Sequence, residues 1–227
     1  MLVLALDTTT RAGSAAVARD GRVVAEHAGD PSLTHGQRLP RELMVVLERG
    51  AVTLADIDLF AVAAGPGSFT GLRVGIATMQ GLAMAAARRV VPVSALEALA
   101  RAARAPTNVA AWMDAQRGEV FAALYDGEGR VLVEPSSLSP EATLRAWQSR
   151  LAEPTVFIGD GAIRYHDVIS KHPAATVLTH IPPLAGVIGI IASDNPDRAV
   201  LPHAVVPIYI RRSDAELARA KKHGPSS

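Results

Sequence analysis

The 227-residue sequence contains no cysteine, only 4% aromatic residues and almost no net charge. The lack of cysteine excludes disulfides, thiolate zinc sites and cysteine nucleophiles, and it is typical of a reducing compartment. Autonomous RNA binding usually needs aromatic stacking platforms and basic surfaces, and a formal net charge of +1 offers little of the second. We therefore expect the chain alone not to bind nucleic acid or an anionic membrane directly.

Long apolar runs are also missing. The longest strongly apolar run after the N-terminus, residues 184–192, falls well short of the ~20 residues that cross a bilayer. The N-terminal apolar run meets a charge at Asp7, too early for a signal-peptide core, and no basic region precedes it. We expect a strand there and a cytoplasmic protein.

The first half of the chain predicts three consecutive strands followed by alternating helices and strands. An Asp20-Gly21 turn joins the second and third strands. Pro40 is expected at the start of the first helix and Gly50 at its end, and Ser94 with Glu97 forms a capping box for the last helix. The expected strands are 2–6, 14–18, 22–26, 59–64 and 90–93, and the expected helices are 41–49, 70–88 and one opened by Ser94.

The second half repeats this order. Its expected strands are 109–113, 119–125, 130–133, 155–158 and 176–178, with helices after Ser139-Pro140, after Gly159-Asp160-Gly161 and over 184–192. The repeat predicts an α/β protein of two tandem ribonuclease H-like lobes facing a cleft. We place the first lobe at 1–105 and a shortened second lobe at 106–227, with a basic terminal helix near its end. An unrelated mixed α/β protein is the alternative.

Two segments of the first lobe have the chemistry to hold a phosphate group. Asp7-Thr8-Thr9 follows a strand, and residues 65–73 (GPGSFTGLR) join a strand to a helix whose N-terminus favours anions. The second segment is not a P-loop, because Leu72 stands where a lysine is needed. Ordinary turn and helix-capping chemistry, with Ser68 or Thr70 as the cap, explains both segments as well.

Small residues line one face of the helix expected over 70–88, at Gly71, Gly75, Thr78, Gly81 and Ala85. Each interior glycine costs ~1 kcal/mol against alanine, so close approach of another backbone is the expected compensation. That backbone belongs either to this chain or to a partner helix. The partner reading predicts that Gly75→Leu abolishes pairing and leaves the fold largely intact.

Metal ligands are sparse. His35 has no second histidine one turn later, because that position is Leu39, so a loop or surface-contact role is favoured over a metal role. Asp114 and Gly159 stand at strand ends of the second lobe, where they would face the cleft or simply form turns.

Several motifs together resemble the TsaB family, also called YeaZ. They are LALDTT at 4–9, His35 with Arg38, GPGSFTGLRVGIATMQG at 65–81, DAQRGE at 114–119 and PIYIR at 207–211. The resemblance implies an actin-like ATPase fold. It also implies a non-catalytic scaffold or activator subunit that pairs with a TsaD-like catalytic subunit and a TsaE-like ATPase to put threonylcarbamoyl on N6 of the adenosine beside the tRNA anticodon.

The resemblance further implies a partner-binding region on residues 39–49 and 71–88 and a vestigial nucleotide cleft. The partner-binding residues are Leu39, Leu43, Leu47, Gly71, Arg73, Val74, Gly75, Thr78, Gly81, Leu82 and Ala85. The cleft residues are Asp7, Thr8, Thr9, His35, Gly65, Gly67, Ser68, Thr70, Asp114 and Gly159.

No catalytic residue, metal or tightly bound cofactor is expected. ATP or ADP would bind only at an interface with partners, and tRNA only through the complex. Whether the chain alone is a homodimer stays open at this point. A stand-alone ATP-dependent kinase or ATPase using Asp7 and Asp114 around magnesium remains the alternative, and a metallopeptidase is disfavoured by the missing histidine pair.

Overall fold

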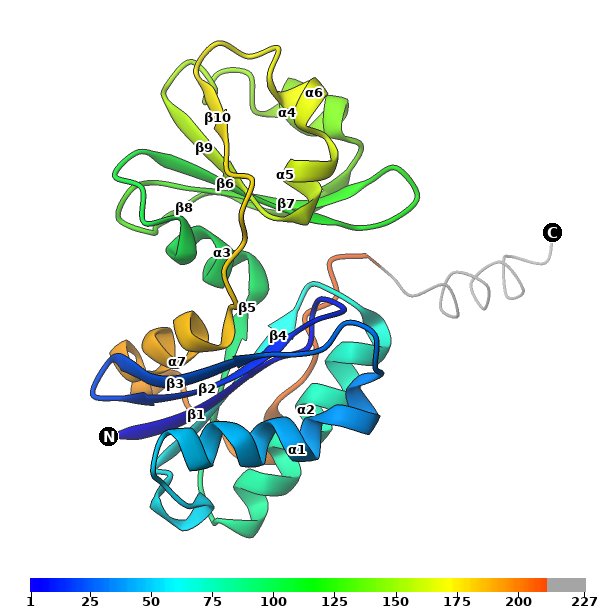
Figure 1. Ribbon diagram of the computed structural model, residues 1–227. Helices are drawn as coiled ribbons and strands as arrows, with labels where there is room; N and C mark the ends of the chain where they lie inside the picture. The colour runs from blue at the N-terminus through cyan, green and yellow to red at the C-terminus, as the bar shows by residue number, and fades with distance from the viewer. Residues whose placement is uncertain (212–227) are drawn as a thin grey trace, which may run out of the picture.

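The computed structural model describes residues 1–211 and shows two five-stranded sheets with helices on both sides of each (Figure 1). The strand orders are β3-β2-β1-β4-β5 and β10-β9-β6-β7-β8. The predicted repeat of a three-strand meander followed by alternating helices and strands is therefore confirmed. The predicted terminal helix near residues 213–222 lies outside the described residues.

The first sheet begins with an antiparallel meander and continues with two parallel strands. Asp20 and Gly21 both have positive φ, 49° and 73°, as a tight hairpin turn between two strands requires. Helices α1 (His35–Arg49) and α2 (Phe69–Ala85) cover the outer face of this sheet. Its strands are β1 (Leu2–Asp7), β2 (Ser14–Arg19), β3 (Arg22–Ala28), β4 (Leu59–Gly65) and β5 (Val90–Ser94).

The second sheet follows the same plan with shorter outer helices. Ser139 caps the helix after the meander by accepting a hydrogen bond from the Ala142 N–H, as its sequence predicts. The outer helices are α4 (Pro140–Ala146), α5 (Asp160–Arg164) and α6 (His166–Ile169). The strands are β6 (Asn108–Asp114), β7 (Val120–Tyr125), β8 (Val131–Leu138), β9 (Thr155–Ile158) and β10 (Ala175–Val177).

Two helices, α3 (Ala95–Ala103) and α7 (Ala185–Asp194), lie between the sheets and are exchanged between the halves of the chain (Figure 1). α3 follows the first sheet in sequence but packs mainly on β6 of the second, whereas α7 follows the second sheet but packs on β1 and β2. Alternation along β1 shows the layering, because Val3 and Ala5 face this middle layer while Leu4 and Leu6 face α1 and α2.

Side chains of the first sheet cap the start of α7. The Ser14 hydroxyl accepts a hydrogen bond from the Ala185 N–H (2.9 Å), and the Glu26 carboxylate accepts one from the Gly186 N–H (2.7 Å). Partial burial raises the pKa of Glu26, while the Gly186 N–H opposes that shift. We expected all residues after 105 to belong to the second lobe, but α7 packs on the first lobe.

The chain also stays on the first lobe after α7. Two short 3-10 helices, η2 (Pro196–Arg198) and η3 (Pro202–Ala204), flank a bridge between Val200 and Val90. A third, η1 (Leu54–Asp56), precedes β4. The second lobe of the described chain is thus formed by residues from β6 to β10, with α3 against its inner face.

Local predictions were wrong at two helix starts. α1 begins at His35 rather than at 41, because Thr34 and Gln37 form a capping box, and Pro40 lies inside the helix. The burial of Leu39, Leu43 and Val46 on one face offsets the hydrogen bond that Pro40 removes. Ser94 caps α3, but the Glu97 carboxylate binds Arg198 instead of completing the box.

No helix within residues 1–211 is both long enough and apolar enough to cross a bilayer.

Replacing Ser14 by alanine tests the cap that the first sheet supplies to α7. We expect a loss of about 1 kcal/mol in the free energy of unfolding, because the Ala185 N–H becomes an unsatisfied buried donor. Urea unfolding measures the loss, and Ser149→Ala, at an exposed turn position, is the control. Equal stabilities of the two variants would contradict this role.

Candidate functional site

A cleft of about 870 Å³ opens between the two lobes. We call it the interlobe cleft. The start of α2, the β1–β2 loop and the start of α1 form its first-lobe wall, and the end of β6 and the start of β7 form the opposite wall. Of the ten predicted cleft residues, the structure brings these six into its lining: Thr9, His35, Gly67, Ser68, Thr70 and Asp114.

The floor of the cleft is a close contact between two backbones. A side chain at Gly71 would place its Cβ 2.1 Å from the Thr8 carbonyl oxygen, and one at Gly67 would lie 2.6 Å from the Thr9 Cβ. The Ser68 N–H donates to the Thr9 carbonyl (2.9 Å), and the Ser68 hydroxyl caps α2 at the Gly71 N–H (3.2 Å). The predicted serine cap is confirmed. The Gly71 N–H that it binds is one of the helix N-terminal donors that an anion would use.

The other four predicted cleft residues lie outside this lining. Asp7 is buried and faces an adjoining cavity of about 530 Å³. Burial raises the pKa of its carboxyl, and hydrogen bonds from the Thr9 N–H (2.8 Å) and hydroxyl (2.6 Å) oppose that shift. Thr8 packs on α2, while Gly65 and Gly159 lie against the Ile208 and Trp112 carbonyls. The turn interpretation of the Asp7 segment therefore fits its contacts.

On the second-lobe wall, acidic side chains hold loops together. Asp114 accepts hydrogen bonds from the Gln116 N–H (3.0 Å) and forms an ion pair with Arg164 (3.1 Å). Asp160 accepts one from the Asp114 N–H (3.0 Å), and desolvation of its carboxyl raises its pKa. Gln116 and Arg117 both have positive φ, 61° and 56°, so this turn is conformationally demanding.

His35 belongs to a buried cluster that fixes the β1–β2 loop. Its Nδ1 lies 2.6 Å from Nη2 of Arg38, which also donates to the carbonyls of Arg11 and Ala12. Arg38 forms a buried ion pair with Glu42 (2.5 Å). Burial and the neighbouring guanidinium lower the pKa of His35. Residues 1–211 contain no group of three or more side chains suited to a metal ion.

The predicted partner-binding residues divide by burial. Leu39 and Leu43 lie in the core of the first lobe, and Gly71 and Gly75 press on Thr8, so these four are not available to a partner. The α2 glycines Gly71 and Gly75 are therefore in contact with this chain itself, and the contact with Thr8 leads us to expect that Gly75→Leu disturbs the fold rather than sparing it. Leu47, Val74, Thr78 and Leu82 are half-buried, and Arg73, Gly81 and Ala85 are exposed.

Three arginine or aromatic residues of the cleft were missed. Arg11, Phe121 and Arg211 line it, although only Arg211 belonged to a motif singled out in the sequence. Arg211 reaches the second lobe, where its Nη1 lies 3.0 Å from Glu119 Oε2. No local spacing predicts this pair, because its members are 92 residues apart.

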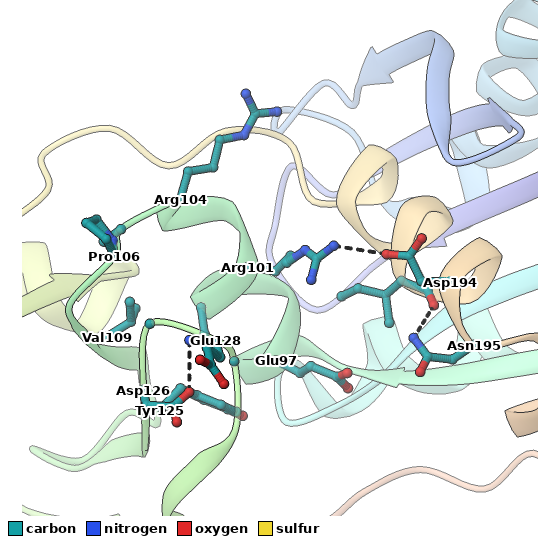
Figure 2. A pocket seen from close by; sticks show the side chains of 15 residues that line it. Glu97, Arg101, Arg104, Pro106, Val109, Tyr125, Asp126, Glu128, Asp194 and Asn195 are labelled. Carbon is teal, nitrogen blue, oxygen red and sulfur yellow. Dashed lines mark hydrogen bonds and ion pairs between the residues drawn. The ribbon is translucent and has the colours of Figure 1, made fainter.

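A separate cavity of about 450 Å³ lies where α3, α7 and the β7–β8 turn meet (Figure 2). Arg101 of α3 forms an ion pair with Asp194 at the end of α7 (2.9 Å). Glu97, which also lies on α3, forms an ion pair with Arg198. Asp126 and Glu128 pair with Arg130. The carboxylates that line this cavity are thus all paired with arginines of this chain. We therefore interpret the cavity as a structural junction between the lobes.

Comparisons with known proteins find TsaD, TsaB and YeaZ proteins. The family model described as TsaD, tRNA N6-adenosine threonylcarbamoyltransferase, matches residues 14–177. The tRNA threonylcarbamoyladenosine biosynthesis protein TsaB of Escherichia coli K12 is 41% identical over 55% of either chain, so the match spans about half of its length. TsaB of Bacillus subtilis 168 is 29% identical over 95% of this chain and 96% of its own.

Solved structures extend the likeness to the fold. YeaZ from Pseudomonas aeruginosa superposes with a TM-score of 0.79 at 32% identity, covering 92% of this chain and 99% of that one. The activator of 2-hydroxyisocaproyl-CoA dehydratase from Clostridium difficile, with bound ADPNP, gives a TM-score of 0.51 at 13% identity, over 87% and 96% of the two chains. The predicted actin-like ATPase fold with two ribonuclease H-like lobes is confirmed.

Gly75 and Gly81 form a matched pair for testing the contact with Thr8. A Cβ at Gly75 would lie 2.1 Å from the Thr8 hydroxyl oxygen, whereas nothing lies within 4 Å of one at Gly81. We expect Gly75→Ala to lower the free energy of unfolding by about 2 kcal/mol or more, and Gly81→Ala to raise it by up to ~1 kcal/mol. Urea unfolding compares them, and an unchanged stability of Gly75→Ala would refute the contact.

His35 should make stability depend on pH. The unfolded chain gains a proton at His35 near the usual pKa of 6.5, whereas the folded pKa is lower. The contribution of His35 to the free energy of unfolding is therefore fully present above pH 6.5 and is lost as the pH falls from there through the folded pKa. His35→Asn keeps a hydrogen-bond acceptor for Arg38 without titrating, so its stability should fall less in the same window. Parallel pH profiles from urea unfolding would contradict this assignment.

Proposed function

Because this chain belongs to the TsaB (YeaZ) family, we propose that it is a non-catalytic scaffold or activator subunit in cytoplasmic tRNA threonylcarbamoyladenosine biosynthesis. In this role it helps a TsaD-like catalytic subunit to transfer a threonylcarbamoyl group to N6 of the adenosine next to the anticodon. The relatives from Escherichia coli and Bacillus subtilis carry the name of that biosynthesis.

The observation that carries the proposal is the outer surface of α1 and α2, which lie side by side on the first sheet (Figure 1). Met44 and Met84 are 61% and 65% exposed there. We define the α1–α2 face as Met44, Leu47, Thr78, Gly81, Leu82, Met84 and Ala85. Exposed methionines beside small residues suit an adaptable apolar interface, since the small residues allow close approach of a partner helix.

We propose that this face pairs with helices of the TsaD-like subunit and, in the isolated protein, with a second copy of the chain. Gly81 supports this choice, because it is the stripe glycine with open space beside it. Thr78 and Leu82 on α2 and Leu47 on α1 are half-buried, so part of each is accessible to a partner. Of the predicted partner-binding residues, this face keeps Leu47, Thr78, Gly81, Leu82 and Ala85, and it adds the exposed Met44 and Met84.

A TsaE-like ATPase completes the proposed complex, with ATP or ADP held only at an interface between subunits and tRNA contacted through the complex. The contacts of the cleft acids support this arrangement. A magnesium-dependent ATPase needs carboxylates directed at the metal and its waters. Asp7 instead binds Thr9, and Asp114 binds Gln116 and Arg164.

Met84→Glu tests the α1–α2 face. We expect the dissociation constant for the TsaD-like subunit to rise at least tenfold, because the new carboxylate would be desolvated at an apolar contact. Titration calorimetry with the two purified subunits measures it. Val131→Glu, at an apolar position 46% exposed on the second lobe, is the matched control. Unchanged affinity of Met84→Glu would refute this face as the pairing surface.

The alternative of a stand-alone kinase or ATPase rests on the size of the interlobe cleft and on the ADPNP bound to a protein of the same fold. Incubation of the purified chain with ATP and magnesium separates the two proposals. Turnover at an enzyme-like rate, lost on Asp114→Asn, would favour the alternative and overturn the scaffold role. Bound zinc in the purified chain, found by elemental analysis, would instead favour a metallopeptidase.

A further inference from the structure

The last described segment, residues 205–211, runs along the first lobe toward the gap between the lobes (Figure 1). Val205 is buried in the core beneath α2, and its carbonyl accepts a hydrogen bond from Gln80 (3.1 Å). Ile208 donates its N–H to the Ala64 carbonyl at the end of β4 (2.7 Å). Gly65 permits this approach, because a Cβ there would lie 2.6 Å from the Ile208 carbonyl oxygen. We call residues 205–211 the strap.

Aromatic contacts fix the strap to the start of α2. The rings of Tyr209 and Phe69 stack with their centroids 5.6 Å apart and an angle of 27° between planes. The Arg73 guanidinium lies 4.0 Å from the Phe69 centroid, and its Nε donates to the Tyr209 hydroxyl (3.4 Å). The strap is thereby held on the first lobe by backbone, core and ring contacts together.

The end of the strap crosses to the second lobe. Arg211 pairs with Glu119, and its guanidinium lies 5.9 Å from the Phe121 ring. Glu119 also accepts a hydrogen bond from the Ser137 hydroxyl (2.8 Å). Ser137 and Arg211 lower the pKa of Glu119, so the carboxylate is charged at neutral pH. Arg211 and Phe121 both line the interlobe cleft, which places this contact at its wall.

The lobes are held differently at the junction of α3 and α7. There Arg101 pairs with Asp194, and Glu97 pairs with Arg198 through two bonds of 2.7 and 3.0 Å. α3 and α7 are also packed in the apolar core between the sheets. The Arg211–Glu119 pair stands at the cleft wall, where its side chains are 28% and 37% exposed. The partly buried Phe121 and Ile210 beside it pack against the edge of that core. Water and salt weaken an ion pair of this exposure, whereas the apolar packing of α3 and α7 does not depend on salt in that way.

We propose that the strap is a latch on the interlobe cleft, with Arg211 and Glu119 as its releasable end and the Val205–Tyr209 contacts as its fixed end. When the ion pair is intact, one continuous segment joins β4 and α2 to β7 and holds the cleft closed. When the pair is broken, the lobes separate at the cleft while α3 and α7 stay packed. The latch controls access to the cleft and does not depend on the proposed partners.

The full-length chain can be tested directly, because the absence of cysteine allows two spin labels to be placed without background. Arg41→Cys on α1 and Arg145→Cys on α4 lie at exposed positions on the outer helices of the two lobes. Double electron–electron resonance then reports the distance between the lobes. We expect Glu119→Gln and Arg211→Gln each to raise the fraction of molecules with the longer label-to-label distance about three- to tenfold. This range corresponds to the loss of one partly exposed ion pair.

Three further samples make the outcome decisive. The exchange of charges, Glu119→Arg with Arg211→Glu, should restore most of the short-distance population. Salt at about 1 M should open the parent protein but add little to Glu119→Gln. Arg130→Gln, which breaks the Arg130–Asp126 pair within the second lobe, is the control and should change nothing. An unchanged distance in the single variants, or a charge exchange that leaves the cleft as open as they do, would overturn the latch.

Discussion

The close contact between α2 and the loop after β1 is the constraint on which the rest of the site depends. Gly71 and Gly75 allow the helix backbone to lie directly on Thr8, and no larger residue fits without displacing that loop. The contact fixes the start of α2, and with it Ser68 and Gly67 on the cleft floor. The helix-propensity cost of these two glycines, ~1 kcal/mol each, is thus offset by packing inside the chain. Gly81 has no such contact within the described chain, and the space beside it is where we propose that a partner helix packs.

The exchange of α3 and α7 makes the lobes parts of one core. Each helix packs on the sheet of the other half, so the apolar layer between the sheets contains residues from both halves of the chain. Neither half would bury its inner sheet face alone, since the covering helix comes from elsewhere in the sequence. The lobe separation that we propose is therefore placed on the cleft side, where the partly exposed Arg211–Glu119 pair joins the lobes.

The sequence predicted the elements and their repeat well because those depend on local patterns, such as alternating burial and the Asp20-Gly21 turn. It failed where two local rules competed, as at Pro40, where burial of a helix face outweighed the proline preference for a helix start. It also left the glycine stripe ambiguous. Small residues at helical spacing show that something lies close, but only the fold shows that Thr8 is that neighbour for Gly71 and Gly75. Arg211 and Glu119 meet through tertiary structure alone.

The two surfaces of the first lobe, the α1–α2 face and the strap, are connected through a single helix. α2 carries Met84 and Gly81 toward its end and Phe69 and Arg73 at its start, where they hold Tyr209 of the strap. A helix transmits displacement along its axis because its backbone hydrogen bonds make it stiff. Its start is also seated on Thr8 at the cleft floor. A force on the outer end of α2 would therefore act on the floor of the cleft and on its latch together.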